Sequence, residues 1–147
     1  IQMCMVSSFV KKPEEDPAKA EARRIELQGL REKYGEYSAV TDEKVREEYR
    51  NAYYEVMEKY GGPRATVEDL VDHIDHVVNL VGVDYAGIGS DFDGGGGLEG
   101  CDDVTEMPKI TEELVRRGYS KEEIQKIWGG NFMRVFRRVV EVSREDG

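Results

Sequence analysis

Two short apolar segments constrain the fold of this chain more than any other feature. Residues 1–10 (IQMCMVSSFV) form a nearly continuous apolar run of strand length, and residues 85–89 (YAGIG) form a second one. Such runs are typical of strands that are covered on both faces, as in a parallel sheet. Because a long helix-forming stretch separates them, we predict two parallel strands joined by a helical crossover. Two strands do not make a stable parallel sheet alone, so the chain looks like part of a larger α/β fold.

The remaining segments have the composition and periodicity of helices. The clearest begins at Thr66, where the sequence TVED resembles a capping box and apolar residues then recur on one face as far as Val81. Ser120 and Glu123 form a second such box, and Asn131 is expected to cap the last helix. We predict helices over residues 18–34, 42–60, 66–81, 104–118, 120–128 and 131–143.

Composition excludes several classes of function. The 147 residues, 39% of them apolar, are enough for one domain with a real core. The net charge of -10 disfavours non-specific binding to nucleic acid. No run approaches the roughly 18 apolar residues of a membrane span, and nothing resembles a signal peptide, so we expect a soluble protein, cytoplasmic or periplasmic. The sequence begins at Ile1, inside an apolar run, and we expect the natural N-terminus to precede this residue.

A pair of aspartates follows the second predicted strand directly. Asp91 and Asp93 alternate along what we expect to be an extended segment, so that one of them faces a site at the carboxyl end of the strand. A carboxylate there can bind a metal or act as a general acid or base, although Asp followed by glycines is also ordinary turn chemistry. The run Gly94–Gly97 suits either a close backbone approach or a flexible loop.

Two familiar glycine-rich loops do not fit this segment well. A phosphate-binding loop requires Lys and Ser or Thr after its glycines, and Leu98 and Glu99 stand there instead. A calcium-binding hand would use Asp91 and Asp93 as its first and third ligands, but its fifth position is Gly95 and a strand precedes it.

The histidines and cysteines form no convincing catalytic or metal-binding constellation. His73 and His76 are spaced as a helical pair, yet the helical wheel places His76 opposite the apolar face and His73 at its flank, which indicates a solvated surface. Cys4 and Cys101 are too few for a disulfide framework and are interpreted as ordinary thiols. Trp128 and the tyrosines at helical spacing are interpreted as packing residues.

Three stretches together are more specific than any single motif. They are VDHIDH (71–76), GIGSDFDG (87–94) and the segment GYS (118–120) through GGNFMRV (129–135). In this order and spacing they resemble the C-terminal part of the membrane (renal) dipeptidase family, metallopeptidase family M19. The resemblance is strong over roughly residues 64–140 and looser over the opening strand.

This resemblance implies a fold and a chemistry. Residues 1–147 would be the C-terminal portion, the last two strands and their helices, of a TIM-like (β/α)8 barrel of the amidohydrolase superfamily, with residues 13–63 as a helical crossover region. The family resemblance implies two zinc ions, Zn2+, that activate water for dipeptide hydrolysis. Asp91 would be the last-strand aspartate that contacts the dipeptide substrate, takes a proton from the nucleophile and hands it to the leaving amine. Asp93 would support the loop.

The departures from the family matter as much as the match. Its metal ligands belong to earlier strands, so no metal ligand is assigned here, and His73 and His76 match its crossover helix instead. Cys4 stands where many relatives have Asn, which affects the substrate contacts of that strand. The resemblance therefore implies that this chain alone is inactive and that its partner is the rest of the same barrel.

Two rival functions remain open at this point. The helices over residues 18–60 could be the surface of a non-catalytic acidic interaction module, and the complete protein could be an amidohydrolase of other specificity. A homodimer is also considered, and no nucleic-acid partner is expected.

Overall fold

The computed structural model describes residues 1–12 and 16–145 and divides the chain into two compact units. Unit 1 comprises residues 1–12 and 64–147, and unit 2 comprises residues 13–63. Within the described ranges, no helix is both long enough and apolar enough to cross a lipid bilayer.

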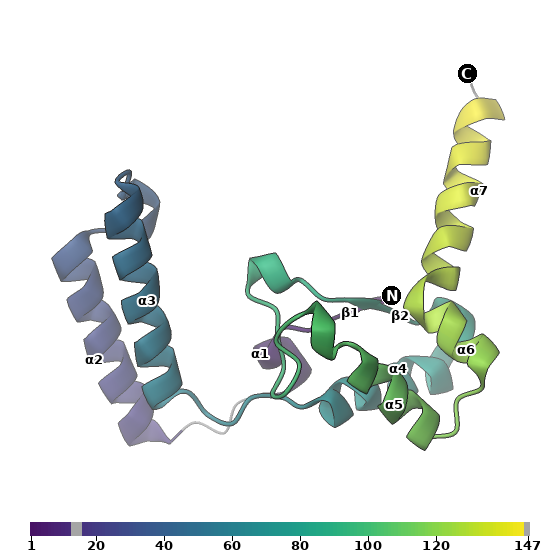
Figure 1. The fold of residues 1–147 in the computed structure, drawn as a ribbon, viewed down its shortest axis with the longest axis horizontal. Coiled ribbons are helices and arrows are strands. Elements are labelled where there is room, and N and C mark those ends of the chain that lie inside the picture. Colours follow the sequence, from purple (N-terminus) through teal and green to yellow (C-terminus); the bar gives the residue numbers. More distant parts are fainter. Residues whose placement is uncertain (13–15, 146–147) are drawn as a thin grey trace. The chain divides into compact units, whose positions relative to one another are not determined.

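The two predicted strands of unit 1 are present, and they are parallel. β1 (Gln2–Cys4) pairs with β2 (Gly87–Gly89) in a register that sets Gln2 opposite Gly87 and Cys4 opposite Gly89. Figure 1 shows the pair at the centre of unit 1. Among the described residues each strand pairs only with the other, so this register brings their carboxyl ends together at one edge.

Both strands are shorter than the sequence predicted. The predicted strand over residues 1–10 ends at Cys4, and the chain then enters the short helix α1 (Ser7–Val10). Residues 83–85 form a 3-10 turn instead of the start of the second strand. The reason is pairing: β2 offers three residues before the chain turns at Asp91, and the Ser7 hydroxyl accepts a hydrogen bond from the Ala65 amide at 2.7 Å, which favours a turn there.

The helix α4 (Val67–Val81) packs against β1 and contributes residues to the core. Its predicted capping box is confirmed: Thr66 Oγ1 accepts a hydrogen bond from the Asp69 amide at 3.3 Å, and Asp69 Oδ2 accepts one from the Thr66 amide at 2.9 Å. The apolar face of α4 is buried among side chains from β1, the loop after β2, and the following helices. The fully buried side chains of this core include Met5, Leu70, Val71, Ile74, Leu98, Ile110, Leu114 and Ile127.

The helices after the loop are more broken than predicted. The range 104–118 contains a 3-10 turn (Val104–Glu106) and then α5 (Pro108–Arg116), because Pro108 suits the first turn of a new helix. The range 120–128 contains α6 (Lys121–Gln125), which begins with the predicted Ser120 capping box, and runs into a π-helical turn kinked at Gly129 (Lys126–Gly130). Trp128 packs against the core and donates a hydrogen bond to Thr111 Oγ1 at 2.8 Å.

An arginine just after α5 ties these helices to α4. Arg117 pairs with Asp75 at 2.6 Å and with the nearly buried Glu113 at 2.7 Å, and it donates to the Glu68 carbonyl oxygen at 2.9 Å. Burial alone would lower the pKa of Arg117, but its hydrogen bonds with the carboxylates outweigh that effect and raise it. The guanidinium therefore stays charged. Hydrogen bonds from Arg116 and Arg117 hold the pKa of the Glu113 carboxyl below its ordinary value.

The last helix, α7 (Asn131–Glu145), leaves most of its length uncovered (Figure 1). Asn131 was expected to cap it, and this is wrong. The buried Asn131 side chain donates instead to the carbonyl oxygens of Val83 at 2.7 Å and Ala86 at 2.9 Å, which anchors the helix to the entry of β2. Beyond that anchor an apolar stripe is exposed, here called the α7 stripe: Phe132, Val135, Phe136, Val139 and Val142.

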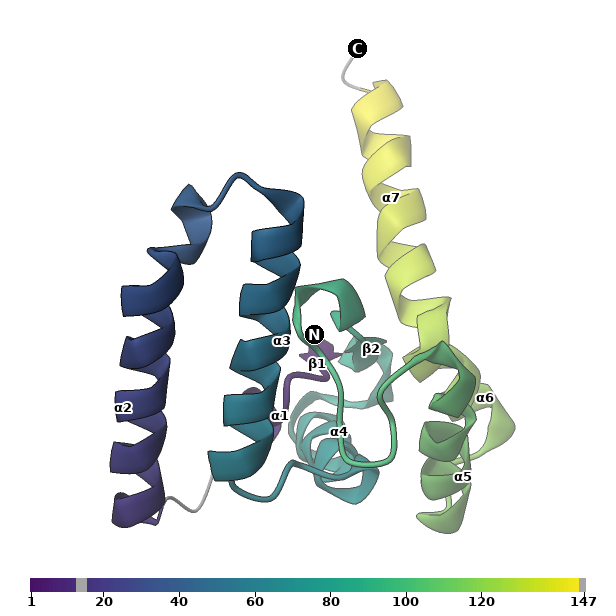
Figure 2. The ribbon, with the colours of Figure 1, turned by 60° about the vertical axis from the view of Figure 1, so that its left-hand side comes forward.

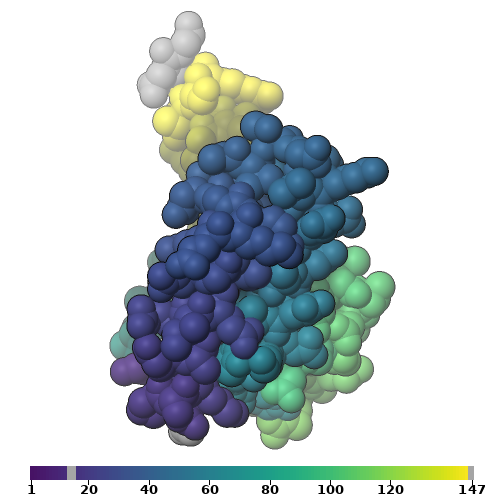
Figure 3. Space-filling view, turned by 90° about the vertical axis from the view of Figure 1, so that its left-hand side faces the viewer, coloured from purple at the N-terminus to yellow at the C-terminus, as the bar shows by residue number. Residues whose placement is uncertain are grey.

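Unit 2 is an antiparallel helical hairpin of α2 (Pro17–Tyr34) and α3 (Glu43–Tyr60), with a 3-10 turn (Tyr37–Ala39) in the connection (Figure 2). Figure 3 shows the two helices packed side by side. Tyr49 is buried between the rings of Tyr34 and Tyr37, each with its centroid 5.4 Å away. Near the open end, Glu26 accepts hydrogen bonds from Lys59 and Tyr60.

Candidate functional site

The loop after β2 returns along the exit of β1. The Met5 amide donates to the Gly89 carbonyl oxygen at 3.0 Å, and the Gly97 amide donates to the Met5 carbonyl oxygen at 2.7 Å. The loop between Gly89 and Gly97 is therefore held at the carboxyl ends of both strands. In parallel sheets this edge is where ligands are usually bound.

Asp91 lies in this loop, two residues beyond β2, but not in the conformation expected. The predicted extended segment is wrong: Asp91 has φ 54° and ψ 32°, and residues 92–94 form a 3-10 turn. Among the described residues, Asp91 is the one residue other than glycine with a positive φ. This conformation costs about 1–2 kcal/mol for an L-residue, and such strain persists where the surroundings enforce it.

Three of the four glycines after Asp91, at positions 95, 96 and 97, are explained by this turn. The Asp91 carbonyl oxygen accepts from the Gly94 amide at 3.0 Å and from the Gly96 amide at 2.6 Å. A Cβ at Gly96 would lie 2.1 Å from the Ser90 carbonyl oxygen, so no side chain fits there. Gly95 and Gly97 have φ values of 95° and 148°. The run therefore forms a sharp turn that is held by hydrogen bonds to the Asp91 carbonyl oxygen.

The Asp91 side chain has one polar neighbour at the strand ends. The Cys4 thiol, from the last residue of β1, donates toward Asp91 Oδ2 with a sulfur–oxygen distance of 3.8 Å. Asp91 and Asp93 are both exposed, and Cys4 is partly buried. From the sequence, Cys4 is interpreted as an ordinary thiol, at a position where many relatives have Asn, and is not paired with Asp91. The signal that could have found this pair is the parallel register, which sets Cys4 opposite Gly89.

The other sequence candidates lie apart from this loop. His73 and His76 are exposed on α4, as predicted, and His73 Nε2 is 2.7 Å from the Val10 carbonyl oxygen. Both cysteines are free thiols, and burial raises the pKa of the Cys101 thiol. Over residues 1–12 and 16–145, no three side chains of His, Cys, Asp or Glu are grouped so as to hold a metal ion.

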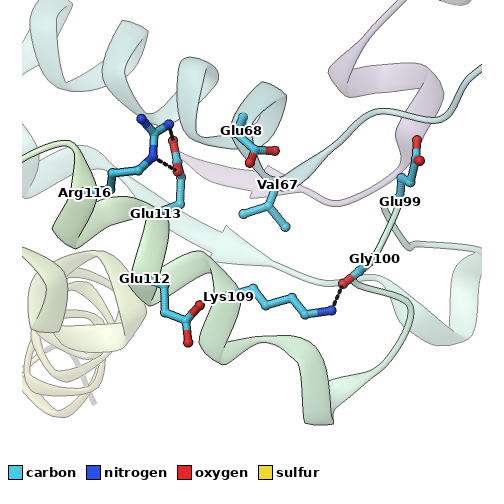
Figure 4. A pocket seen from close by; sticks show the side chains of 8 residues that line it. All are labelled: Val67, Glu68, Glu99, Gly100, Lys109, Glu112, Glu113 and Arg116. Atoms are coloured by element: carbon cyan, nitrogen blue, oxygen red, sulfur yellow. Dashed lines mark hydrogen bonds and ion pairs between the residues drawn. The ribbon is translucent and has the colours of Figure 1, made fainter.

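A separate cavity of about 450 Å³ lies between the start of α4 and α5 (Figure 4). Three of its charged side chains have partners: Arg116 pairs with Glu113 at 2.6 Å, and Lys109 donates to the Gly100 carbonyl oxygen at 2.5 Å. Neither Asp91 nor Cys4 lines it. The cavity is therefore separate from the candidate site at the strand ends.

Comparison with known proteins gives a consistent family. The profile of membrane dipeptidases (peptidase family M19) matches residues 1–146. Dipeptidase tcpJ of Claviceps purpurea is 44% identical over 81 residues, which are 54% of this chain and 19% of that protein. Human dipeptidase 3 is 42% identical over 82 residues, 55% of this chain and 17% of that protein.

A solved structure extends the match over most of the chain. The crystal structure of the probable dipeptidase PvdM from Pseudomonas aeruginosa superimposes with a TM-score of 0.61 and 34% sequence identity. It covers 91% of this chain and 35% of the PvdM chain. The matched region is thus less than a fifth of these two curated relatives and about a third of the solved structure.

Proposed function

The chain belongs to the membrane dipeptidase family, peptidase family M19, and from this membership we propose that it supplies the proton-transfer carboxylate of a dipeptide hydrolase. The residue is Asp91. The proposal depends on the position of Asp91. It lies in a loop that backbone hydrogen bonds hold at the carboxyl ends of two parallel strands.

The reaction needs a group of this kind. When water attacks the carbonyl carbon of a peptide bond, it must lose a proton, and the departing amine must gain one. A carboxylate within hydrogen-bond reach can accept the first proton and deliver the second, so that it returns to its starting state after each turnover. Asp91 is a carboxylate whose backbone position is fixed and whose side chain is exposed at the strand ends.

The family resemblance implies two zinc ions, but the described residues do not fit such a centre. They contain no grouped set of three donors, and the two histidines lie on α4. We propose that the metal ligands lie in polypeptide outside this chain. The role left to this chain is proton transfer by Asp91.

We further propose that the chain is the C-terminal portion of a (β/α)8 barrel. The described part of β1 and β2 leaves one edge of each strand unpaired, and the α7 stripe lies uncovered. Unpaired edges and large apolar faces are normally covered in a folded domain. The fraction of the PvdM chain that is matched agrees with a portion of this size.

The test is substitution of Asp91→Asn in a complete protein that contains this chain. We expect hydrolysis of Ala-D-Ala to slow by at least about 100-fold, since Asn cannot accept the proton, while zinc content stays the same. His76→Ala, on the exposed face of α4, is the control and should change neither quantity. Near-normal turnover of Asp91→Asn would overturn the proposed role. Loss of zinc in His76→Ala would show that α4 contributes to the metal centre.

The comparisons favour dipeptides over other amide substrates. The curated relatives reported above are named dipeptidases, and the solved neighbour is titled a probable dipeptidase. An amidohydrolase of other specificity would instead hydrolyse a non-peptide amide faster than any dipeptide when the complete protein is profiled.

A further inference from the structure

The glycine at position 94 has no backbone reason to be glycine. Among the described residues, six glycines have positive φ values, and Gly94 is not one of them. They are Gly35, Gly82, Gly95, Gly97, Gly100 and Gly118. An alanine could therefore adopt its backbone conformation without strain.

The reason for a glycine at this position lies in the side chain above it. A Cβ built on Gly94 would lie 2.3 Å from Asp91 Oδ1, 2.8 Å from Cγ and 3.0 Å from Oδ2. Carbon and oxygen atoms do not approach so closely without a bond, so any side chain at Gly94 must push the carboxylate away. The clash is with the end of a flexible side chain, so the loop can keep its fold while Asp91 rotates.

The other carboxylate oxygen has its own neighbour. Cys4 Sγ lies 3.8 Å from Asp91 Oδ2, and the parallel register fixes the backbone of Cys4 opposite Gly89. One oxygen thus occupies the space that a Cβ at position 94 would fill, and the other accepts the hydrogen bond from the thiol. These contacts come from two segments that are more than eighty residues apart in the sequence.

We propose that Gly94 and Cys4 are positioning residues that fix the orientation of the Asp91 carboxylate. The inference rests on the proposed function of Asp91. Gly94 acts by leaving room for the carboxylate, and Cys4 acts by donating a hydrogen bond to it. Neither needs to touch the substrate, so their loss should lower the rate of the chemical step and leave substrate binding nearly unchanged.

The experiment compares kcat and KM for Ala-D-Ala in the complete protein. Gly94→Ala should lower kcat by about 10-fold or more and change KM by less than about two-fold, because a small displacement of a catalytic group is costly. Cys4→Ala should lower kcat by several-fold, and Cys4→Ser, which keeps a donor, should recover most of that loss. Gly29→Ala, where a new Cβ meets no atom within 4 Å, is the matched control and should leave both constants unchanged.

A double substitution shows whether the two residues act through Asp91. In an Asp91→Asn background, Gly94→Ala should cause little further loss, because the group that it displaces no longer transfers protons. A further loss as large as in the parent protein would overturn the proposal and indicate a purely structural role. If Gly94→Ala does not fold, the kcat values of Cys4→Ala and Cys4→Ser provide the test. Equal kcat values for Cys4→Ala and the parent protein would then overturn the proposal.

Failure of this inference is distinguishable from failure of the proposed function. If Asp91→Asn is inactive while Gly94→Ala and Cys4→Ala both keep the parent kcat, the positioning inference is wrong and the role of Asp91 stands. If Asp91→Asn is active, both are wrong.

Discussion

The Asn131 side chain bridges the last helix and the second strand. Its amide is almost fully buried and donates to two carbonyl oxygens, those of Val83 and Ala86. Asn131→Ala removes both donors and leaves two carbonyl groups without a partner. We expect a loss of about 1–3 kcal/mol in the free energy of unfolding. Urea unfolding checks this, at a protein concentration where sedimentation shows a single species.

The control for this prediction is Asn79→Ala, an exposed position on α4. It makes the same chemical change without a buried partner and should alter stability by less than about 0.5 kcal/mol. Equal effects at both positions would show that the Asn131 bridge does not stabilise unit 1.

At the residue scale, the sequence predicts location better than orientation. Its pattern placed Asp91 just after the second strand, where the structure has it, because strand ends are marked by local glycines and turns. The left-handed backbone of Asp91 and its contact with Cys4 depend on the return path of the loop. Asn131 was mistaken for a cap because its true partners lie 45 and 48 residues earlier.

At the scale of elements, the start of α4 links stability to pH. Asp69 accepts from the Thr66 amide and pairs with Lys11 at 3.0 Å, and these contacts, the first above all, lower the pKa of its carboxyl below the ordinary value. The ionised form therefore favours the folded state. Its contribution is complete above the unfolded pKa of about 4, and it is lost as the pH falls from there through the folded pKa.

We expect Asp69→Asn to reduce the fall in stability below about pH 4, and to lower stability at pH 7 by about 1 kcal/mol through the weakened cap. Urea unfolding at pH 7, 5, 4 and 3 measures both effects. Asp93→Asn, at an exposed turn position, is the control and should keep the parent pH dependence. A parent-like acid dependence in Asp69→Asn would contradict the assignment.

Elements that are specified locally were the easiest to predict. The capping boxes at Thr66 and Ser120 are confirmed because each is complete within four residues. The strands were predicted too long because their length is set by the partner strand and by the turn at Asp91. The break between residues 104–106 and α5 was missed although Pro108 was its visible signal.

At the scale of the molecule, the α7 stripe makes a prediction about association. Phe132 and Phe136 stack with ring centroids 6.2 Å apart, and both are more than half exposed. Exposed apolar stripes of this kind are usually buried by contact with other protein surface. In a solution of the isolated chain, the surface available for this contact is that of another copy. We expect sedimentation velocity to show concentration-dependent association, which replacing both phenylalanines by serine should reduce.

The control replaces Tyr53 and Tyr54, an exposed aromatic pair on the hairpin of unit 2, by serine. We expect association to persist in this variant. Association that is lost with the tyrosines and kept without the phenylalanines would favour the rival interpretation, in which the hairpin is an interaction surface. A chain that stays monomeric and unfolds cooperatively would contradict the proposal that the α7 stripe is buried against other protein surface.

Family membership was predicted from three motifs, and the match to residues 1–146 confirms it. The parallel pairing of two strands was predicted from their apolar pattern and is also confirmed. Closure into a barrel and the origin of the metal ligands stay predictions, because the described residues form two paired strands and contain no grouped set of metal ligands.

The most direct measurement is a crystal structure of the complete protein bound to a phosphinic dipeptide analogue, whose tetrahedral phosphorus mimics the hydrated peptide bond. We predict one Asp91 carboxylate oxygen within about 2.6–3.2 Å of a phosphinate oxygen. An analogue bound elsewhere, with both Asp91 oxygens facing bulk solvent on the outside of the molecule, would contradict the account.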